Sequence, residues 1–127
     1  MDTNALWKFL LWGYATSVAI ETPVLLAGLA RVHPVGRRLF AGLWLTACTY
    51  PIVVLVLPIL LDSDNHRALY LTVAETFAPA AECALFGLAY HRGANLPLRV
   101  RVQDYVVIIA ANLASFLLGE WLQRIGL

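Results

Sequence analysis

The chain has few charged residues and almost no net charge. Charged residues make up 13% of its 127 positions, and the formal net charge is +1. An ordinary soluble domain is about one-quarter charged, and a nucleic-acid-binding domain carries a strongly basic surface. The sequence therefore excludes nucleic acid as a partner. Hydrophobic residues make up 61% of the chain, which indicates that lipid is its main solvent.

Cysteines and familiar catalytic motifs are also scarce. Cys48 and Cys83 lie inside apolar runs without CxxC spacing, so they indicate ordinary packing and neither a disulfide framework nor a redox motif. HExxH, GxSxG and P-loop motifs are missing from the sequence. A familiar membrane hydrolase is therefore not expected, and neither is a bound nucleotide. The first residues lack the basic cluster and cleavage site of a secretory signal, so we expect the first apolar segment to remain in the mature protein.

Long apolar runs fill most of the chain. A bilayer core of about 30 Å needs about 20 apolar residues per helix. Segments of this kind cover about 5–29, 39–61, 68–90 and 105–122, with short polar connections between them. The sequence predicts an all-α, integral membrane four-helix bundle with up-down-up-down order and short loops. Residues 1–127 are expected to form a single transmembrane domain.

The charges of the connecting loops predict an orientation. Six arginines lie in the 31–38 and 92–104 loops, whereas the opposite side carries only Lys8, Arg67 and Arg124. Basic residues are retained on the cytoplasmic side of membrane proteins. Both termini are therefore expected on the non-cytoplasmic side of a cytoplasmic or inner membrane.

Glutamates are the clearest functional signal within the apolar segments. Four of them lie in or near the spans, and no lysine or arginine lies at the middle of any span. A carboxylate in hydrocarbon must be protonated, reach a basic group, share a proton with another carboxylate, or hold a cation. Prolines also interrupt the helices, and neighbouring helices must satisfy the carbonyls that they free.

Three polar residues of different segments have the same expected depth. Glu21, Glu82 and Asn112 each lie about seven or eight residues from the cytoplasmic end of their segment, so a helical rise of about 1.5 Å per residue puts them in one layer. Helical spacing adds other polar groups on the same faces. We expect a proton- or cation-binding site made by Glu21, Glu82, Asn112, Glu75, Thr49, Tyr50 and Ser115. An oxygen-only site favours a proton or a hard cation such as sodium, magnesium or calcium.

Each glutamate also has a structural interpretation. Glu21 and Glu82 could be neutral acids whose hydrogen bonds only hold helices together. Glu75 could form an ion pair with Lys8. For Glu120 the favoured interpretation is a surface pair with Arg124, four residues later on the same helix face.

The histidines are expected to be solvated. His33, His66 and His91 all fall in the predicted loops, and solvated side chains are the usual state there. We therefore expect neither haem nor a buried transition metal.

The pattern favours an ion or small-solute transporter or channel. Carboxylates, proline-broken helices and small residues such as Gly13, Ala78, Ala81 and Gly119 could line a cation path. Four helices enclose little volume, so the expected partners are membrane lipids and either a homo-oligomer or another membrane subunit. The alternative is a non-enzymatic assembly subunit whose polar stripes bind partner helices. An enzyme is not favoured, although two carboxylates could act as acid and base on a lipid.

Overall fold

The computed structural model describes residues 3–62 and 64–126, which form helices, turns and loops without a strand. The helices are α1 (Thr3–Gly28), α2 (Val35–Pro51), α3 (Leu57–Leu60), α4 (Arg67–Phe86) and α5 (Leu98–Arg124). Two wide π-helical turns, η1 (Ile52–Val56) and η2 (Gly87–His91), continue α2 into α3 and extend α4. The helical segments long and apolar enough to span a membrane are Leu10–Gly28, Val35–Leu60, Arg67–His91 and Leu98–Leu122. The prediction of an all-helical chain with four such helices is confirmed.

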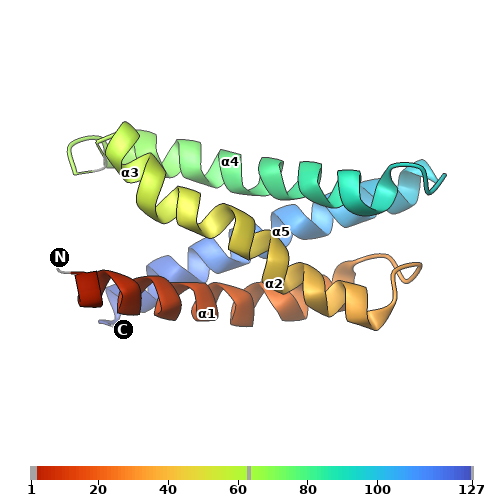
Figure 1. Cartoon of the computed structure of the whole chain (residues 1–127), viewed down its shortest axis with the longest axis horizontal. Helices are drawn as coiled ribbons and strands as arrows, with labels where there is room; N and C mark the ends of the chain where they lie inside the picture. Colours follow the sequence, from red (N-terminus) through yellow and green to blue (C-terminus); the bar gives the residue numbers. More distant parts are fainter. Residues whose placement is uncertain (1–2, 63, 127) are drawn as a thin grey trace.

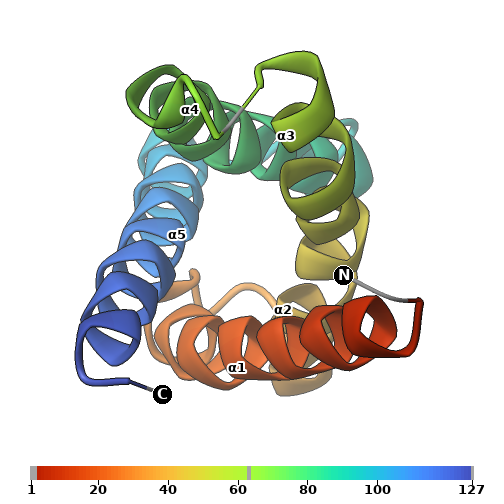
Figure 2. The same ribbon diagram turned by 90° about the vertical axis from the view of Figure 1, so that its left-hand side faces the viewer.

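The helices form a closed ring. α1 packs against α2 and α5, and α4 packs against the same two neighbours. The ring is visible as a four-sided arrangement in the end-on view of Figure 2. Both chain termini and the α3–α4 connection lie at one end of the molecule, called here the terminal end (Figure 1). The 29–34 and 92–97 connections lie at the other end, called the loop end (Figure 1).

The outward faces of the helices are strongly apolar. Large side chains such as Trp12, Ile59, Leu88 and Leu117 are exposed on every side of the bundle. Exposure of so many large apolar side chains is unfavourable in water and favourable in hydrocarbon. The surface is compatible with a membrane protein.

The apolar core lies in the half of the bundle nearer the loop end. Leu25, Leu45, Phe86 and Ile108, one from each side of the ring, are almost completely buried against one another. The helices approach closely on one side of this core: a methyl group at Gly42 of α2 would collide with the hydroxyl of Thr22 on α1 and would lie only 3.2 Å from its Cα. Close packing therefore seals this half of the bundle.

Prolines shape the second membrane-spanning segment as the sequence indicated. Pro51 ends α2 and Pro58 is the second residue of α3, so the two prolines lie on either side of the wide turn η1. Pro58 has no backbone N–H for the turn that precedes it. The hydroxyl of Tyr70 on α4 instead donates to the Val53 carbonyl at 2.8 Å. A neighbouring helix thus satisfies a carbonyl in this turn, as membrane helices with prolines require.

The last helix begins earlier than the apolar pattern indicated. α5 starts at Leu98, directly after Pro97, rather than near residue 105. Its first turns are amphipathic, with Arg99 and Arg101 exposed and Asp104 fully buried. The expected 92–104 loop is therefore wrong in its second half, because charged residues in a helix lower the hydropathy without breaking the helix.

Candidate functional site

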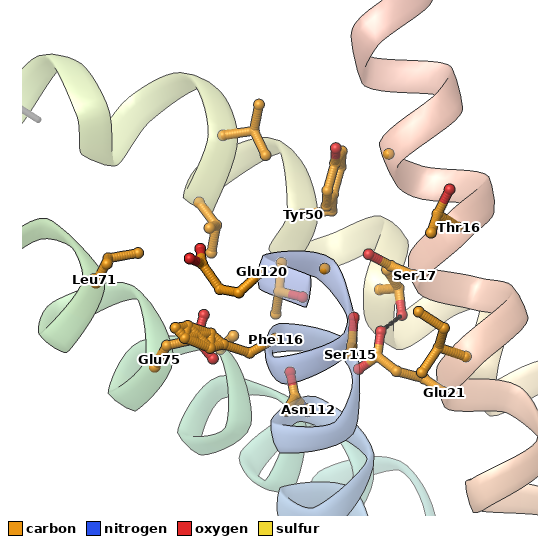
Figure 3. Close-up of a pocket in the computed structure, with 18 of the residues that line it drawn as sticks. Thr16, Ser17, Glu21, Tyr50, Leu71, Glu75, Asn112, Ser115, Phe116 and Glu120 are labelled. Atoms are coloured by element: carbon orange, nitrogen blue, oxygen red, sulfur yellow. Dashed lines mark hydrogen bonds between the residues drawn. The ribbon is translucent and has the colours of Figure 1, made fainter. Parts of the chain in front are cut away.

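A cavity of about 450 Å³ lies between the four sides of the ring. It extends from the level of Arg67, at the start of α4, and Glu120, near the end of α5, inward to Glu21 and Glu82. In Figure 3 the labelled side chains of Glu21, Tyr50, Glu75 and Asn112 converge on it from α1, α2, α4 and α5. Its polar lining consists of Thr16, Ser17, Glu21, Thr46, Thr49, Tyr50, Arg67, Tyr70, Glu75, Glu82, Asn112, Ser115 and Glu120.

All the residues expected at the site line this cavity. Glu21, Glu82, Asn112, Glu75, Thr49, Tyr50 and Ser115 share it. Glu21 and Glu82 are each only 3% exposed, and Glu75 is partly buried nearer the terminal end. Equal depth in the sequence thus corresponds to shared space in the structure.

Two threonines of α2 hold the two buried glutamates. Thr46 Oγ1 donates to Glu21 Oε2 at 3.2 Å, and Thr49 Oγ1 lies 3.0 Å from Glu82 Oε2. Residues three apart on a helix share a face, so α2 presents both hydroxyls to the inner end of the cavity. Sequence analysis selected Thr49 but not Thr46 as a site residue. The shared helical face was the available signal for Thr46.

The α5 side of the cavity offers further oxygen. The side-chain amide nitrogen of Asn112 donates to the Ile108 carbonyl at 3.0 Å, which orients its oxygen toward the cavity. Ser115 follows one turn later on the same face. Across the cavity, Tyr50 lies so close to Gly13 that a methyl group there would collide with its hydroxyl. Gly13 therefore makes room for the tyrosine.

The ion pairing at the outer end of the cavity differs from the sequence-based expectation. Glu120 Oε1 lies 3.2 Å from Arg67 Nη2, so the pair joins α5 to α4 rather than linking Glu120 to Arg124 on its own helix. Arg67 begins α4 at the level of Glu120, which brings the two side chains together. Within residues 3–62 and 64–126 the structure forms no Lys8–Glu75 ion pair, and Glu75 faces the cavity instead.

The cavity is closed toward the loop end by the apolar core. Leu25 lies one turn beyond Glu21 on α1, and Phe86 lies one turn beyond Glu82 on α4. Both side chains are at most 2% exposed. The site is therefore a polar chamber with an apolar floor.

A second polar cluster lies beyond this floor and was missed in the sequence. His33, His91 and Asp104 are 1%, 7% and 0% exposed. The expectation that His33 and His91 are solvated is therefore wrong, whereas the exposed His66 agrees with it. The error arose because Asp104 was assigned to a loop, although Asp104, Ile108 and Ala111 follow helical spacing on one buried face of α5. The expectation of no buried transition metal rested on solvated histidines, so the sequence no longer supports it.

In comparisons with protein-family models, with curated proteins and with solved structures, nothing matches this chain at a significant level.

Proposed function

We propose that the protein binds a proton or a hard cation between Glu21 and Glu82, and acts as a small ion transporter or channel subunit. The observation that carries this proposal is the convergence of two buried carboxylates, from α1 and α4, on the inner end of one cavity. In the proposed arrangement the chain crosses a cytoplasmic or inner membrane in up-down-up-down order. Both termini, and the outer end of the cavity, face the non-cytoplasmic side.

The charge of the cavity supports a cationic ligand. Its charged lining consists of four glutamates and one arginine, and that arginine is paired with Glu120. An excess of carboxylates in a site with little water attracts protons and cations and repels anions. The neutral lining groups are hydroxyls and an amide, which are ligands for hard cations. The ligand type of the lining groups and the negative charge of the cavity therefore both suit a hard cation.

The hydrogen bonds around Glu82 suit a group that gains and loses a proton. Thr49 Oγ1 lies 3.0 Å from Glu82 Oε2 and 3.2 Å from the Leu45 carbonyl oxygen. A hydroxyl has one proton to donate. When Glu82 is ionised, Thr49 donates to it. When Glu82 is protonated, it donates to Thr49, and Thr49 donates to Leu45. Both states leave the buried carboxyl group hydrogen-bonded.

The closed floor of the cavity supports alternating access rather than a permanently open pore. A continuous path would require the helices to separate around Leu25 and Phe86, where the core is closely packed. Packed helices of this kind move between discrete arrangements. Because one chain encloses the carboxylates, ion binding does not need a second copy. In this proposal, a homo-oligomer or a partner membrane subunit is needed only if the movement of the helices depends on one.

The direction of the polar stripes favours this function over an assembly subunit. Polar residues that bind partner helices would face outward, whereas Glu21, Thr46, Thr49, Glu82 and Asn112 are buried inside the ring. The outward faces are apolar and suit lipid contact. The interior position of the stripes therefore supports ion binding.

Ion-dependent thermal unfolding of the purified protein tests the proposal. A ligand that binds only the folded protein stabilises it by RT ln(1 + [L]/Kd). The melting temperature should rise with one of sodium, magnesium or calcium, or with proton concentration, and this response should be lost in Glu82→Gln. Glu120→Gln is the matched control, because its carboxylate lies at the outer end in an ion pair, and it should keep the response. An unchanged response in Glu82→Gln, or none in the native protein, would contradict the proposal.

A further inference from the structure

Three side chains at the loop end point at one another. His33 Nε2 and His91 Nε2 each lie 2.7 Å from the same oxygen, Oδ2 of Asp104. His33 comes from the connection after α1, His91 is the last residue of η2, and Asp104 lies in the second turn of α5. Three separate segments therefore place two imidazoles and a carboxylate around one point.

Each of the three groups also has a polar partner outside the cluster. The backbone N–H of Ala30 donates to Asp104 Oδ1 at 2.9 Å. The Tyr105 hydroxyl lies 3.2 Å from His91 Nδ1, and Arg37 Nη1 lies 3.2 Å from His33 Nδ1. Outer hydrogen-bond partners such as Ala30 and Tyr105 orient metal-binding carboxylates and imidazoles, whereas Arg37 is only a donor. Asp104 and His91 are thus oriented for metal binding, and all three groups are buried.

We propose that His33, His91 and Asp104 form a site for one divalent transition-metal ion, with zinc preferred. The three candidate ligand atoms lie within 4.8 Å of one another. Two imidazole nitrogens and one carboxylate oxygen are ligands that zinc favours, with a further position left for water. The oxygen-lined cavity on the other side of the apolar floor suits hard cations, so the two sites differ in ligand class.

Metal binding requires a small expansion of the cluster. The 2.7 Å separations are hydrogen-bond distances, whereas nitrogen and oxygen ligands of a tetrahedral zinc lie about 3.3 Å apart. The ligand atoms must therefore separate by roughly 0.6 Å. His33 in a connection and His91 at a helix end are placed where such a shift is easiest.

In the metal-bound state, the Nδ1 protons of His33 and His91 face different neighbours. A neutral imidazole that binds metal through Nε2 carries its proton on Nδ1. At His91 this proton can be donated to the Tyr105 oxygen, so that hydrogen bond is kept. At His33 the Nδ1 proton would face the guanidinium of Arg37, which is itself only a donor.

Arg37 must therefore leave His33 when metal binds. Its guanidinium carbon already lies 4.6 Å from the centre of the Tyr90 ring, and the side chain is only partly buried. A cation over an aromatic face keeps a favourable interaction there. Arg37 and the metal ion thus compete for His33, and bound metal would tie the three segments of the loop end together.

Cobalt titration of the full-length protein in detergent, after chelator treatment, tests this site. One equivalent of Co²⁺ should give the visible absorption bands of four-coordinate nitrogen and oxygen ligation, and Zn²⁺ should displace it. His91→Gln should weaken binding about tenfold or more, although its amide still offers Asp104 an N–H donor and so supports folding. His66→Gln is the control, because His66 is exposed at the start of α4, and it should bind cobalt as the native protein does.

Arg37→Gln tests whether Arg37 and the metal ion compete for His33. Removing the positive charge that faces His33 should strengthen cobalt binding several-fold. Absence of the cobalt bands in the native protein would overturn the proposal whether or not any variant folds. Equal binding by the native protein and a folded His91→Gln would overturn it as well, and weaker binding by a folded Arg37→Gln would overturn the competition with Arg37.

Discussion

At the residue scale, the hydroxyls of α2 determine how the buried carboxylates are held. Glu21 and Glu82 lie on opposite sides of the ring, yet each meets a threonine of the same helix. A buried carboxylate that loses a hydrogen-bond donor has an unsatisfied oxygen, and this costs free energy because water cannot replace the donor. In the proposed function, Thr46 and Thr49 therefore take part in ion binding, although neither supplies a charge.

The change Thr49→Val tests this role. Valine has nearly the shape of threonine but cannot donate to Glu82. Loss of one hydrogen bond to a buried charged group should cost the bound state about 1–3 kcal/mol, which corresponds to a loss of affinity of about 5- to 150-fold. The affinity is measured by isothermal titration with the ion that stabilises the native protein.

Thr16→Val provides the control for Thr49→Val. Thr16 also lines the cavity, but its hydroxyl donates to the Trp12 carbonyl of its own helix at 2.8 Å. Ion affinity should change little in this variant. Equal losses in the two variants would show that the hydroxyl on Glu82 has no special role.

At the scale of helices, one close approach decides whether the inner half of the bundle is sealed. Gly42 lets α2 come against the backbone of α1 at Thr22, where a methyl group has no room. This contact lies on the sealed side of the cavity, next to the apolar core. Packing at this crossing should therefore contribute to stability.

Gly42→Ala is expected to destabilise the protein by about 1–3 kcal/mol, the usual cost of overpacking. The added methyl group would collide with the Thr22 hydroxyl and would lie only 3.2 Å from the Thr22 Cα, so the backbone must shift slightly even after the side chain rotates. Denaturant unfolding in detergent measures the change. Gly119→Ala on α5 is the control, because nothing lies near its added methyl group, and greater helix propensity should leave it unchanged or slightly more stable. A Gly42→Ala protein as stable as native would contradict the role of this crossing.

Hydropathy and residue counting predicted the apolar helices and the residues that share the cavity. Glu21, Glu82 and Asn112 have equal depth because a helix has a constant rise, so counting from the segment ends was enough. Counting along the sequence could not predict which residues of different helices pair with each other. The Arg67–Glu120 pair and the contacts of α2 with the two glutamates depend on how each helix is rotated about its axis. The buried histidines were missed because Asp104 extends a helix beyond its apolar segment.

At the scale of the whole molecule, the two ends of the bundle differ in charge and in structure. The loop end carries the exposed arginines Arg31, Arg92, Arg99 and Arg101 and lies next to the buried histidine cluster. The terminal end carries the outer part of the carboxylate cavity. Because basic residues are retained on the cytoplasmic side of membrane proteins, the proposed orientation puts the open part of the proposed ion path on the non-cytoplasmic side.

Cysteine labelling tests the proposed orientation. Single cysteines at Asn65 and Asn95, in a chain whose two native cysteines are replaced by alanine, lie in exposed positions at opposite ends. An impermeant maleimide should label the Asn65→Cys protein from the non-cytoplasmic side and the Asn95→Cys protein only after the membrane is opened. Labelling of both positions from one side would contradict the arrangement.

Ion flux into liposomes tests whether Glu21 and Glu82 act together on one transported ion. Native protein, Glu21→Gln, Glu82→Gln, the double variant and the Glu120→Gln control are reconstituted and assayed for proton, sodium, magnesium and calcium flux. We expect flux of one of these ions in the native protein and in the control. Each single variant should lose most of it, and the double variant should lose little more, because residues that act on one ion as a unit are strongly non-additive. No flux in the native protein, or native flux in folded Glu21→Gln and Glu82→Gln, would contradict the claim.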